Sequence, residues 1–537
     1  MADNDISSYM DYAEELDDII EAQWPQVNTK KVYLDSYPLE NTSSGTRVPG
    51  ANEALMDYLE KGVCVMSYTG HGGVKALATE QVFSLSDIQS MNNYDMLPFV
   101  QTATCEFSKF DSPTVISAGE MMILNPHGGA IAMLTTVRPT LAQHNQTLSK
   151  SFHTHLYELE NHNNLRFGDI YRVVKNHQYL KSNIVYVLFG DPALRFYYPT
   201  ESVQTENMSG TDIRTVRGYV SGPDDRVDNM FNGVLDFRVY DQKNEYTTLG
   251  QMSAAASDYA FFSDVLYEGK VSVTNGRFEL KFPVPANISH GHNPGRLSYY
   301  AYDSIRGIEA NGAYDDLFFE TPAVLDDQGP QIHLYWNTPD FQNGSVVTRR
   351  GTLYADLFDE QGIYHYNVSI GRDLVLRSSI PAYDNIVLNE NYEPQIDDFR
   401  RGRIALRVGE LKDGTYSFSL KAWDTQNNSS EAEIVFEVKE GAIVSQVYNA
   451  PNPFTGETWF SFSHGDMTDH LSVVIEVYDV LGRRVAMFQK ETEAFEGVVA
   501  PIQWDGSALR PGLYLYRLTV TNSKGKSKTI SQRMIKK

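Results

Sequence analysis

Two residues that could form a nucleophile–base pair each follow a short apolar run. Residues 62–68 are followed by Thr69-Gly70-His71-Gly72-Gly73, and residues 97–104 are followed by Cys105. Both runs have strand length and are rich in Val, Phe and Thr, which predicts two buried strands. A thiol becomes a strong nucleophile when a neighbouring imidazole takes its proton. His71 and Cys105 are therefore candidates for base and nucleophile, although a structural cysteine and a surface histidine would give the same pattern.

The segment between these runs indicates how the two residues could meet. Residues 85–91 have a helical pattern, and strand, helix, strand in that order implies two parallel strands joined by a crossover. Ligands bind just beyond the carboxyl ends of such strands. The glycines beside His71 allow close approach of a substrate, and the N–H groups of Gly72 and Cys105 are the predicted oxyanion donors.

Four segments of the chain resemble motifs of the gingipain family of cysteine peptidases. Residues 69–73 and 102–107 (Thr-Ala-Thr-Cys-Glu-Phe) resemble its His-Gly and Cys motifs, in that order and with His71 and Cys105 34 positions apart. Residues 188–194 resemble the segment that closes the family's catalytic domain. Residues 1–5 (Met-Ala-Asp-Asn-Asp) are similar to its Ala-Asp-Asp/Asn segment. The resemblance implies a caspase-like α/β cysteine endopeptidase.

A third catalytic member would hold the imidazole in one orientation. In the family this acceptor is a carboxylate upstream of the histidine, and Glu14 is the candidate by position, with Asp11 second. A solvated carboxylate on a helix surface is the alternative for Glu14. Glu106 follows the nucleophile directly and is expected to take no catalytic step.

Composition excludes some classes of protein. The 537 residues are too many for one core, and a net charge of −24 argues against a nucleic-acid partner. The two cysteines do not form a disulfide scaffold, and Cys64 is expected to be packed inside its strand. No apolar stretch has the length of a transmembrane helix. The first residues lack a signal peptide, so the chain is expected to be the carboxyl-terminal part of a longer, exported precursor.

The pattern along the chain predicts a multidomain α/β plus all-β protein. Residues 1–199 alternate helices and strands and read as a peptidase domain with a largely parallel sheet whose N-terminal part is missing. Helices are expected at 7–22, 52–61, 85–91, 115–124, 140–158 and 167–182, and a short strand at 31–35. Residues 200–325 and 326–443 lack a helical period and predict two β-sandwich modules. A recurring unit, two apolar or aromatic residues followed by Asp, predicts strand ends that enter turns; it occurs at 239–241, 357–359, 422–424 and 477–479.

Residues 444–537 resemble the immunoglobulin-like carboxyl-terminal sorting domain of the Bacteroidota type IX secretion system. The segments that carry the likeness include 447–454, 477–485, 504–506 and 509–514, and 477–485 is expected to form a hairpin across Leu481-Gly482. Segments of the middle region, such as 275–278 and 295–301, look like the long β-region of that system's sortase family. The resemblance implies a cell-surface or outer-membrane endopeptidase that removes sorting domains from secreted cargo, works with outer-membrane components of the system, and joins the cargo to anionic lipopolysaccharide.

Two other functions fit the same residues. The chain could be a secreted gingipain-like protease whose own sorting domain is a removable signal, or a non-catalytic surface module built on a decayed peptidase. No cofactor is expected for catalysis. His153 and His155 have the wrong spacing for a zinc pair on a helix. Acidic turns such as Asp326-Asp327 could hold structural calcium, with a plain turn as the alternative.

Overall fold

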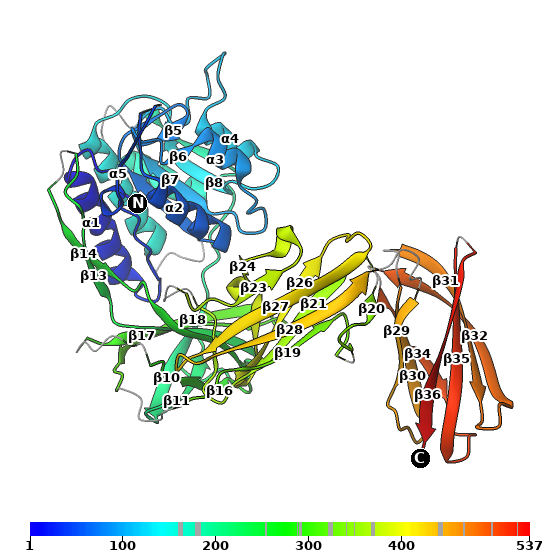
Figure 1. The fold of residues 1–537 in the computed structure, drawn as a ribbon. Coiled ribbons are helices and arrows are strands. Elements are labelled where there is room, and N and C mark those ends of the chain that lie inside the picture. Colours follow the sequence, from blue (N-terminus) through cyan, green and yellow to red (C-terminus); the bar gives the residue numbers. More distant parts are fainter. Residues whose placement is uncertain are drawn as a thin grey trace.

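The computed structural model places four bodies in a row from the N-terminus to the C-terminus (Figure 1). It describes residues 1–537 except 44, 159–164, 178–183, 253–254, 287, 289–292, 321–325, 340, 348, 367–370, 439–443, 465–467, 496–497 and 524. A mixed α/β domain comes first, and three strand-rich bodies follow it. The predicted fold class, α/β followed by all-β modules, is confirmed.

The first domain is built on a four-stranded sheet in the order β3-β7-β8-β9. The strands are β3 (Val65–Thr69), β7 (Phe99–Ala103), β8 (Ala132–Thr136) and β9 (Tyr186–Gly190). The first three are mutually parallel, and β9 adds antiparallel to β8 at the edge. Every residue of β7 and β8 is buried, as expected for central strands of a sheet covered on both faces.

Helices cover this sheet and end close to the predicted positions. They are α1 (Ser8–Gln23), α2 (Pro49–Lys61), α3 (Leu85–Ser90), α4 (Ala118–Leu124), α5 (Ala142–Tyr157) and α6 (Phe167–His177). Capping boxes at Ser84 and Ser117 start α3 and α4, because each serine and the acidic residue three positions later satisfy each other's backbone N–H groups. The predicted end of α6, to 182, lies outside the described residues.

Two local predictions were wrong. Residues 31–35 were expected to form a strand, but the chain makes only a bridge at Tyr33 and then a 3-10 turn, Leu34–Ser36. Cys64 was expected to be packed, but β3 begins one residue later and the Cys64 side chain is exposed. Short strands β1 (Glu40–Thr42), β2 (Gly45–Arg47), β4 (Gly72–Gly73), β5 (Ala76–Leu77) and β6 (Phe83–Ser84) complete the domain.

The next body is a seven-stranded sheet in the order β15-β12-β17-β18-β10-β11-β16, wrapped around one apolar core. Its strands are β10 (Glu201–Ser209), β11 (Ile213–Ser221), β12 (Gly233–Tyr240), β15 (Val265–Val273), β16 (Arg277–Pro283), β17 (Gly295–Asp303) and β18 (Ile308–Leu317). A separate hairpin, β13 (Asn244–Thr247) with β14 (Asp258–Phe261), projects from this body along α1.

The third body is a sandwich of two sheets around its own core, and Tyr364 and Tyr366 also enter the core of the body before it. One sheet holds β19 (Gln331–Trp336), β21 (Gly351–Phe358), β25 (Tyr392–Gln395) and β26 (Asp398–Val408). The other holds β20 (Val346–Val347), β22 (Ile363–Tyr364), β23 (Val375–Ser378), β24 (Ile386–Val387), β27 (Gly414–Asp424) and β28 (Ser429–Val438).

The last body is a single antiparallel sheet folded around a fourth core. Its strands are β29 (Val444–Ala450), β30 (Glu457–His464), β31 (Thr468–Tyr478), β32 (Arg484–Phe495), β33 (Val498–Val499), β34 (Ile502–Asp505), β35 (Gly512–Asn522) and β36 (Ser527–Lys536). The predicted hairpin across Leu481-Gly482 joins β31 to β32.

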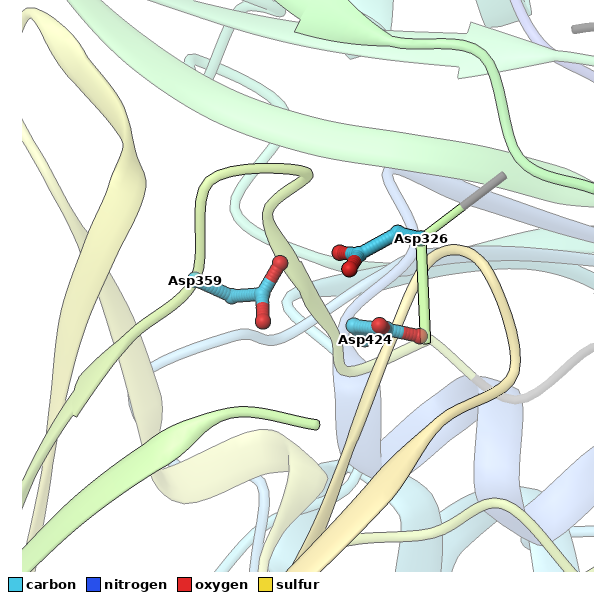
Figure 2. A group of neighbouring side chains, drawn as sticks. All are labelled: Asp326, Asp359 and Asp424. Carbon is cyan, nitrogen blue, oxygen red and sulfur yellow. The ribbon is translucent and has the colours of Figure 1, made fainter. Parts of the chain in front are cut away.

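Three aspartates meet at one end of the third body (Figure 2). Asp359 and Asp424 come from two of the recurring strand-end units, and Asp326 comes from the predicted break between modules. Carboxylate oxygens of all three lie within 4.8 Å of one another. Within the described part of the chain no ion pair neutralises them. Burial, together with the charges of Asp424 and Asp326, raises the pKa of Asp359 to about 7.

This pKa predicts how the stability of the third body depends on pH. The folded state keeps a proton on Asp359 that the unfolded chain releases near pH 4, so the contribution is full in acid and is lost as the pH rises through 7. We expect Asp359→Asn to raise Tm relative to wild type at pH 8 by about 2–4 °C. The difference should shrink or reverse at pH 5. Thermal unfolding of both proteins at the two pH values measures it, and a difference independent of pH would contradict this protonation.

Candidate active site

The parallel pairing of β3 with β7 sets the geometry of the candidate site. Thr69 pairs with Ala103 at the carboxyl ends of the two strands, and the Gly70 N–H donates to the Ala103 carbonyl at 3.2 Å. His71 and Cys105 each lie two residues beyond this last pair. The structure therefore brings the predicted base and nucleophile to the same edge of the sheet.

His71 is held mainly through its backbone and by residues of the first segment of the chain. Its N–H donates to Asp3 Oδ2 at 2.7 Å, and the Tyr68 hydroxyl donates to its carbonyl at 2.6 Å. The imidazole is 49% exposed, and its Nε2 lies 3.8 Å from Asp5 Oδ2. The ring of Tyr9 meets the imidazole edge to face, with 5.6 Å between centroids.

The surroundings of His71 are acidic. Asp3 is buried, and burial raises the pKa of its carboxyl. Glu80 is 1% exposed, and neither of its carboxylate oxygens has a hydrogen-bond partner. Burial raises the pKa of Glu80 too, with further contributions from Asp3 and Asp5. The imidazole of His71 therefore lies among carboxyl groups, two of which have raised pKa values because they are buried.

Cys105 is half-buried, and its thiol contacts the backbone of Thr140. Sγ lies 3.7 Å from the Thr140 carbonyl oxygen and 3.5 Å from the Thr140 nitrogen. The next residue, Glu106, has φ of 46°, a left-handed conformation that turns the chain sharply after the cysteine, and its side chain pairs with Lys109 at 2.8 Å. Sγ makes no hydrogen bond to His71 in this structure.

Tyr9 lies near both members of the predicted dyad. Its ring contacts His71, and burial followed by the charges of Asp3 and Cys105 raises the pKa of its phenol to about 12. No sequence pattern singled out Tyr9, because an aromatic residue in the first turn of an amphipathic helix is usually a core residue.

Glu14, the predicted acceptor for His71, binds elsewhere. Both of its oxygens accept from Lys31 Nζ, at 2.9 and 2.8 Å, and the Tyr33 hydroxyl donates to it. Asp17 also pairs with Lys31, at 2.7 Å. The carboxylate beside the imidazole is Asp5. Asp5 lies in the 1–5 segment that resembles the gingipain motif, so this motif could have identified Asp5 from the sequence. Asp11, the second candidate, is exposed on α1.

Gly72 joins the histidine loop to the cysteine strand. It begins β4, and a Cβ at this position would lie 2.3 Å from Thr104 Oγ1, directly before the nucleophile. Only a residue without a side chain allows this approach. Thr104 is fully buried and its hydroxyl has no hydrogen-bond partner. The predicted oxyanion donors, the Gly72 and Cys105 amides, therefore belong to two loops in direct contact.

This contact predicts coupling between positions 72 and 104. Gly72→Ala should destabilise the domain by about 1–3 kcal/mol, because overpacking forces the loops apart. Thr104→Ala alone should cost little, since it removes an unpaired buried hydroxyl. The double variant Gly72→Ala/Thr104→Ala should recover most of the loss. Denaturant unfolding of the four proteins measures the coupling, and strictly additive effects would contradict the contact.

Comparisons with known proteins give two family matches. Residues 1–197 match the model described as "Peptidase family C25", and residues 446–533 match the "Secretion system C-terminal sorting domain". No curated protein matches the chain. The described residues include no helix long and apolar enough to cross a membrane.

Two solved structures are similar to parts of the chain. Dimeric latent PorU from Porphyromonas gingivalis is 26% identical, with a TM-score of 0.33, over 69% of this chain and 38% of PorU. The Arg-specific cysteine proteinase gingipain R (RGPB) is 14% identical, with a TM-score of 0.31, over 58% of this chain and 66% of the proteinase. The chain thus spans well under half the length of PorU and about two thirds of gingipain R.

The likeness to gingipains and to a sorting domain that the sequence motifs predicted is therefore confirmed at the level of family. Residues 1–197 match a family of cysteine peptidases, and residues 446–533 match a secretion-system sorting domain, which indicates an exported chain.

Proposed function

We propose that the chain is part of a cysteine endopeptidase at the cell surface that cleaves carboxyl-terminal sorting signals from exported cargo of the type IX secretion system. The observation that carries this proposal is the position of His71 and Cys105, each two residues past paired strands, on a chain that also holds a sorting domain. We also propose that the enzyme transfers the cleaved cargo to anionic lipopolysaccharide.

In the proposed mechanism, Asp5 orients the imidazole and the other ring nitrogen accepts the Cys105 proton. The thiol exchanges its contact with Thr140 for the imidazole as substrate binds, since catalytic hydrogen bonds often tighten only in the complex. The thiolate attacks the scissile carbonyl carbon, and the amides of Gly72 and Cys105 donate to the oxyanion. The imidazolium then protonates the leaving amine, and water or an amine resolves the thioester.

This mechanism requires no cofactor. We expect structural calcium to bind at the cluster of Asp326, Asp359 and Asp424. The donors there are all carboxylate oxygens, the ligands that Ca²⁺ prefers. Millimolar Ca²⁺ should then raise Tm of the wild-type chain at pH 8 and leave Asp359→Asn unchanged. An equal rise of Tm with Ca²⁺ in both proteins would contradict calcium binding at this cluster.

Loss of either dyad member should abolish the proposed activity. Cys105→Ala and His71→Ala should each lower cleavage of a cargo protein by about a thousandfold, and the double variant should be no worse, because the two residues act as a unit. Cleavage is measured with cargo that carries its own sorting domain. Full cleavage by Cys105→Ala would favour the non-catalytic module instead.

The choice between Asp5 and Glu14 has its own test. Asp5→Asn should lower kcat by about tenfold and change its pH profile, because an amide oxygen stabilises imidazolium less than a carboxylate does. Glu14→Gln should leave kcat near wild type and reduce stability by about 1 kcal/mol, since it weakens the Lys31 network. A larger loss of kcat in Glu14→Gln than in Asp5→Asn would indicate that Glu14, and not Asp5, orients His71.

The fate of the sorting domain separates the proposal from its main alternative. A resident sortase is expected to keep residues 444–537, whereas a secreted protease loses them at export. This expectation rests on the short, partly apolar segment 440–443, which is a poorer protease target than a long exposed linker. That segment lies outside the described residues. Mass spectrometry of the cell-surface protein should recover peptides from 529–537 on the same chain as His71. A mature chain that ends near residue 442 would support the secreted protease.

A further inference from the structure

A hairpin of the second body docks on the peptidase domain behind the candidate site. Strands β13 and β14 run beside α1, away from the sheet that they leave (Figure 1). Asp35 accepts from the N–H groups of Gly250 and Gln251, at 2.9 and 2.7 Å. Lys30 Nζ donates to the Phe262 carbonyl at 2.8 Å, at the other end of the hairpin. The hairpin is therefore fixed to the peptidase domain at both ends.

Aromatic rings fill the space between these two attachments. Tyr259 meets Tyr33 edge to face, with 4.8 Å between centroids, and its hydroxyl donates to Ser36 Oγ at 2.8 Å. Tyr246 stacks on Tyr259 at 5.4 Å. Tyr259 and Phe261 belong to one buried apolar cluster with residues of the peptidase domain, namely Ala2, Tyr9, Met10 and Tyr33.

The opposite side of this cluster supports His71. Tyr9 lies against the imidazole, and Ala2 forms bridges to Tyr33 and to Thr69 at the end of β3. Asp3, the next residue, holds the His71 N–H. Helix α1 has no side-chain cap at Ser7, so packing, more than local capping, holds its first turn. The imidazole is half exposed and depends on this support for its orientation.

We propose that the β13–β14 hairpin is a working part of the peptidase site, in which Tyr259 and its neighbours position Tyr9 and the 1–5 segment against His71. The inference rests on the proposed function. It makes Tyr9 and Tyr259 positioning residues, since neither transfers the proton or bonds to substrate. It also means that the peptidase domain needs the body after it for full activity.

The test reads the state of the Cys105 thiol directly, with iodoacetamide as the probe. The full chain carries Cys64→Ser, because Cys64 is exposed and would react as well. A correctly placed imidazole accepts the thiol proton, so alkylation of Cys105 is expected to stay fast in mild acid. The groups that face His71 are the carboxyls of Asp3, Asp5 and Glu80 and the phenols of Tyr9 and Tyr68; all are kept unchanged.

Tyr259→Ala should lower the alkylation rate at pH 6 by about tenfold, while the rates at pH 10 agree with wild type. Tyr259→Phe keeps the ring and should restore the wild-type profile. Glu245→Ala, an exposed change on the same hairpin, is the matched control. If Tyr259→Ala does not fold, the half-buried Tyr246→Ala tests the same support and should show a loss of about threefold.

The outcomes separate this inference from the proposed function. A wild-type thiol that reacts only in its ionised form above pH 8, with no reactivity at pH 6, would overturn the His71–Cys105 dyad itself. A wild type that is reactive at pH 6, together with the same profile in folded Tyr259→Ala or Tyr246→Ala, would overturn the role of the hairpin and leave the dyad intact.

Discussion

The candidate site depends first on the parallel pairing of β3 with β7. Backbone hydrogen bonds fix the register, so Thr69 and Ala103 end the two strands together and the residues that follow leave the sheet side by side. No side chain has to bring histidine and cysteine to one edge, because the ladder does so. Local contacts then refine the positions of the two loops. Gly72 allows the loops to touch at Thr104, and Asp3 fixes the backbone of His71.

Burial of acid around this edge gives the site its electrostatic character. Asp3 and Glu80 are buried carboxyl groups, and Glu80 has no hydrogen-bond partner to offset its loss of water. An unpaired buried carboxylate is costly, and sites that tolerate such a cost are often functional. The raised pKa values of Asp3 and Glu80 reflect this cost.

The sequence predicted the parts of the site that are local in the chain. Strand, glycine-flanked histidine, helix, strand and cysteine are consecutive, so pattern and motif located His71 and Cys105 together. The sequence did not single out the carboxylate that lies beside the imidazole, because α1 carries several acids and helical spacing does not tell which of them faces His71. Glu14 points to Lys31, and Asp5 lies before the helix begins. Each strand-end aspartate was predicted in a turn, but tertiary structure alone brings Asp326, Asp359 and Asp424 together.

The joint between the hairpin and the peptidase domain pairs side chains with backbone. Asp35 binds two amides of the hairpin, and Gln251 binds the Leu39 N–H and the Tyr37 carbonyl in return, at 3.1 and 2.9 Å. Two side chains therefore specify this attachment, and their partners are groups that nearly every residue carries. Leu39 could therefore be replaced by most residues without loss of its bond to Gln251, but a proline there would remove an amide that the joint uses.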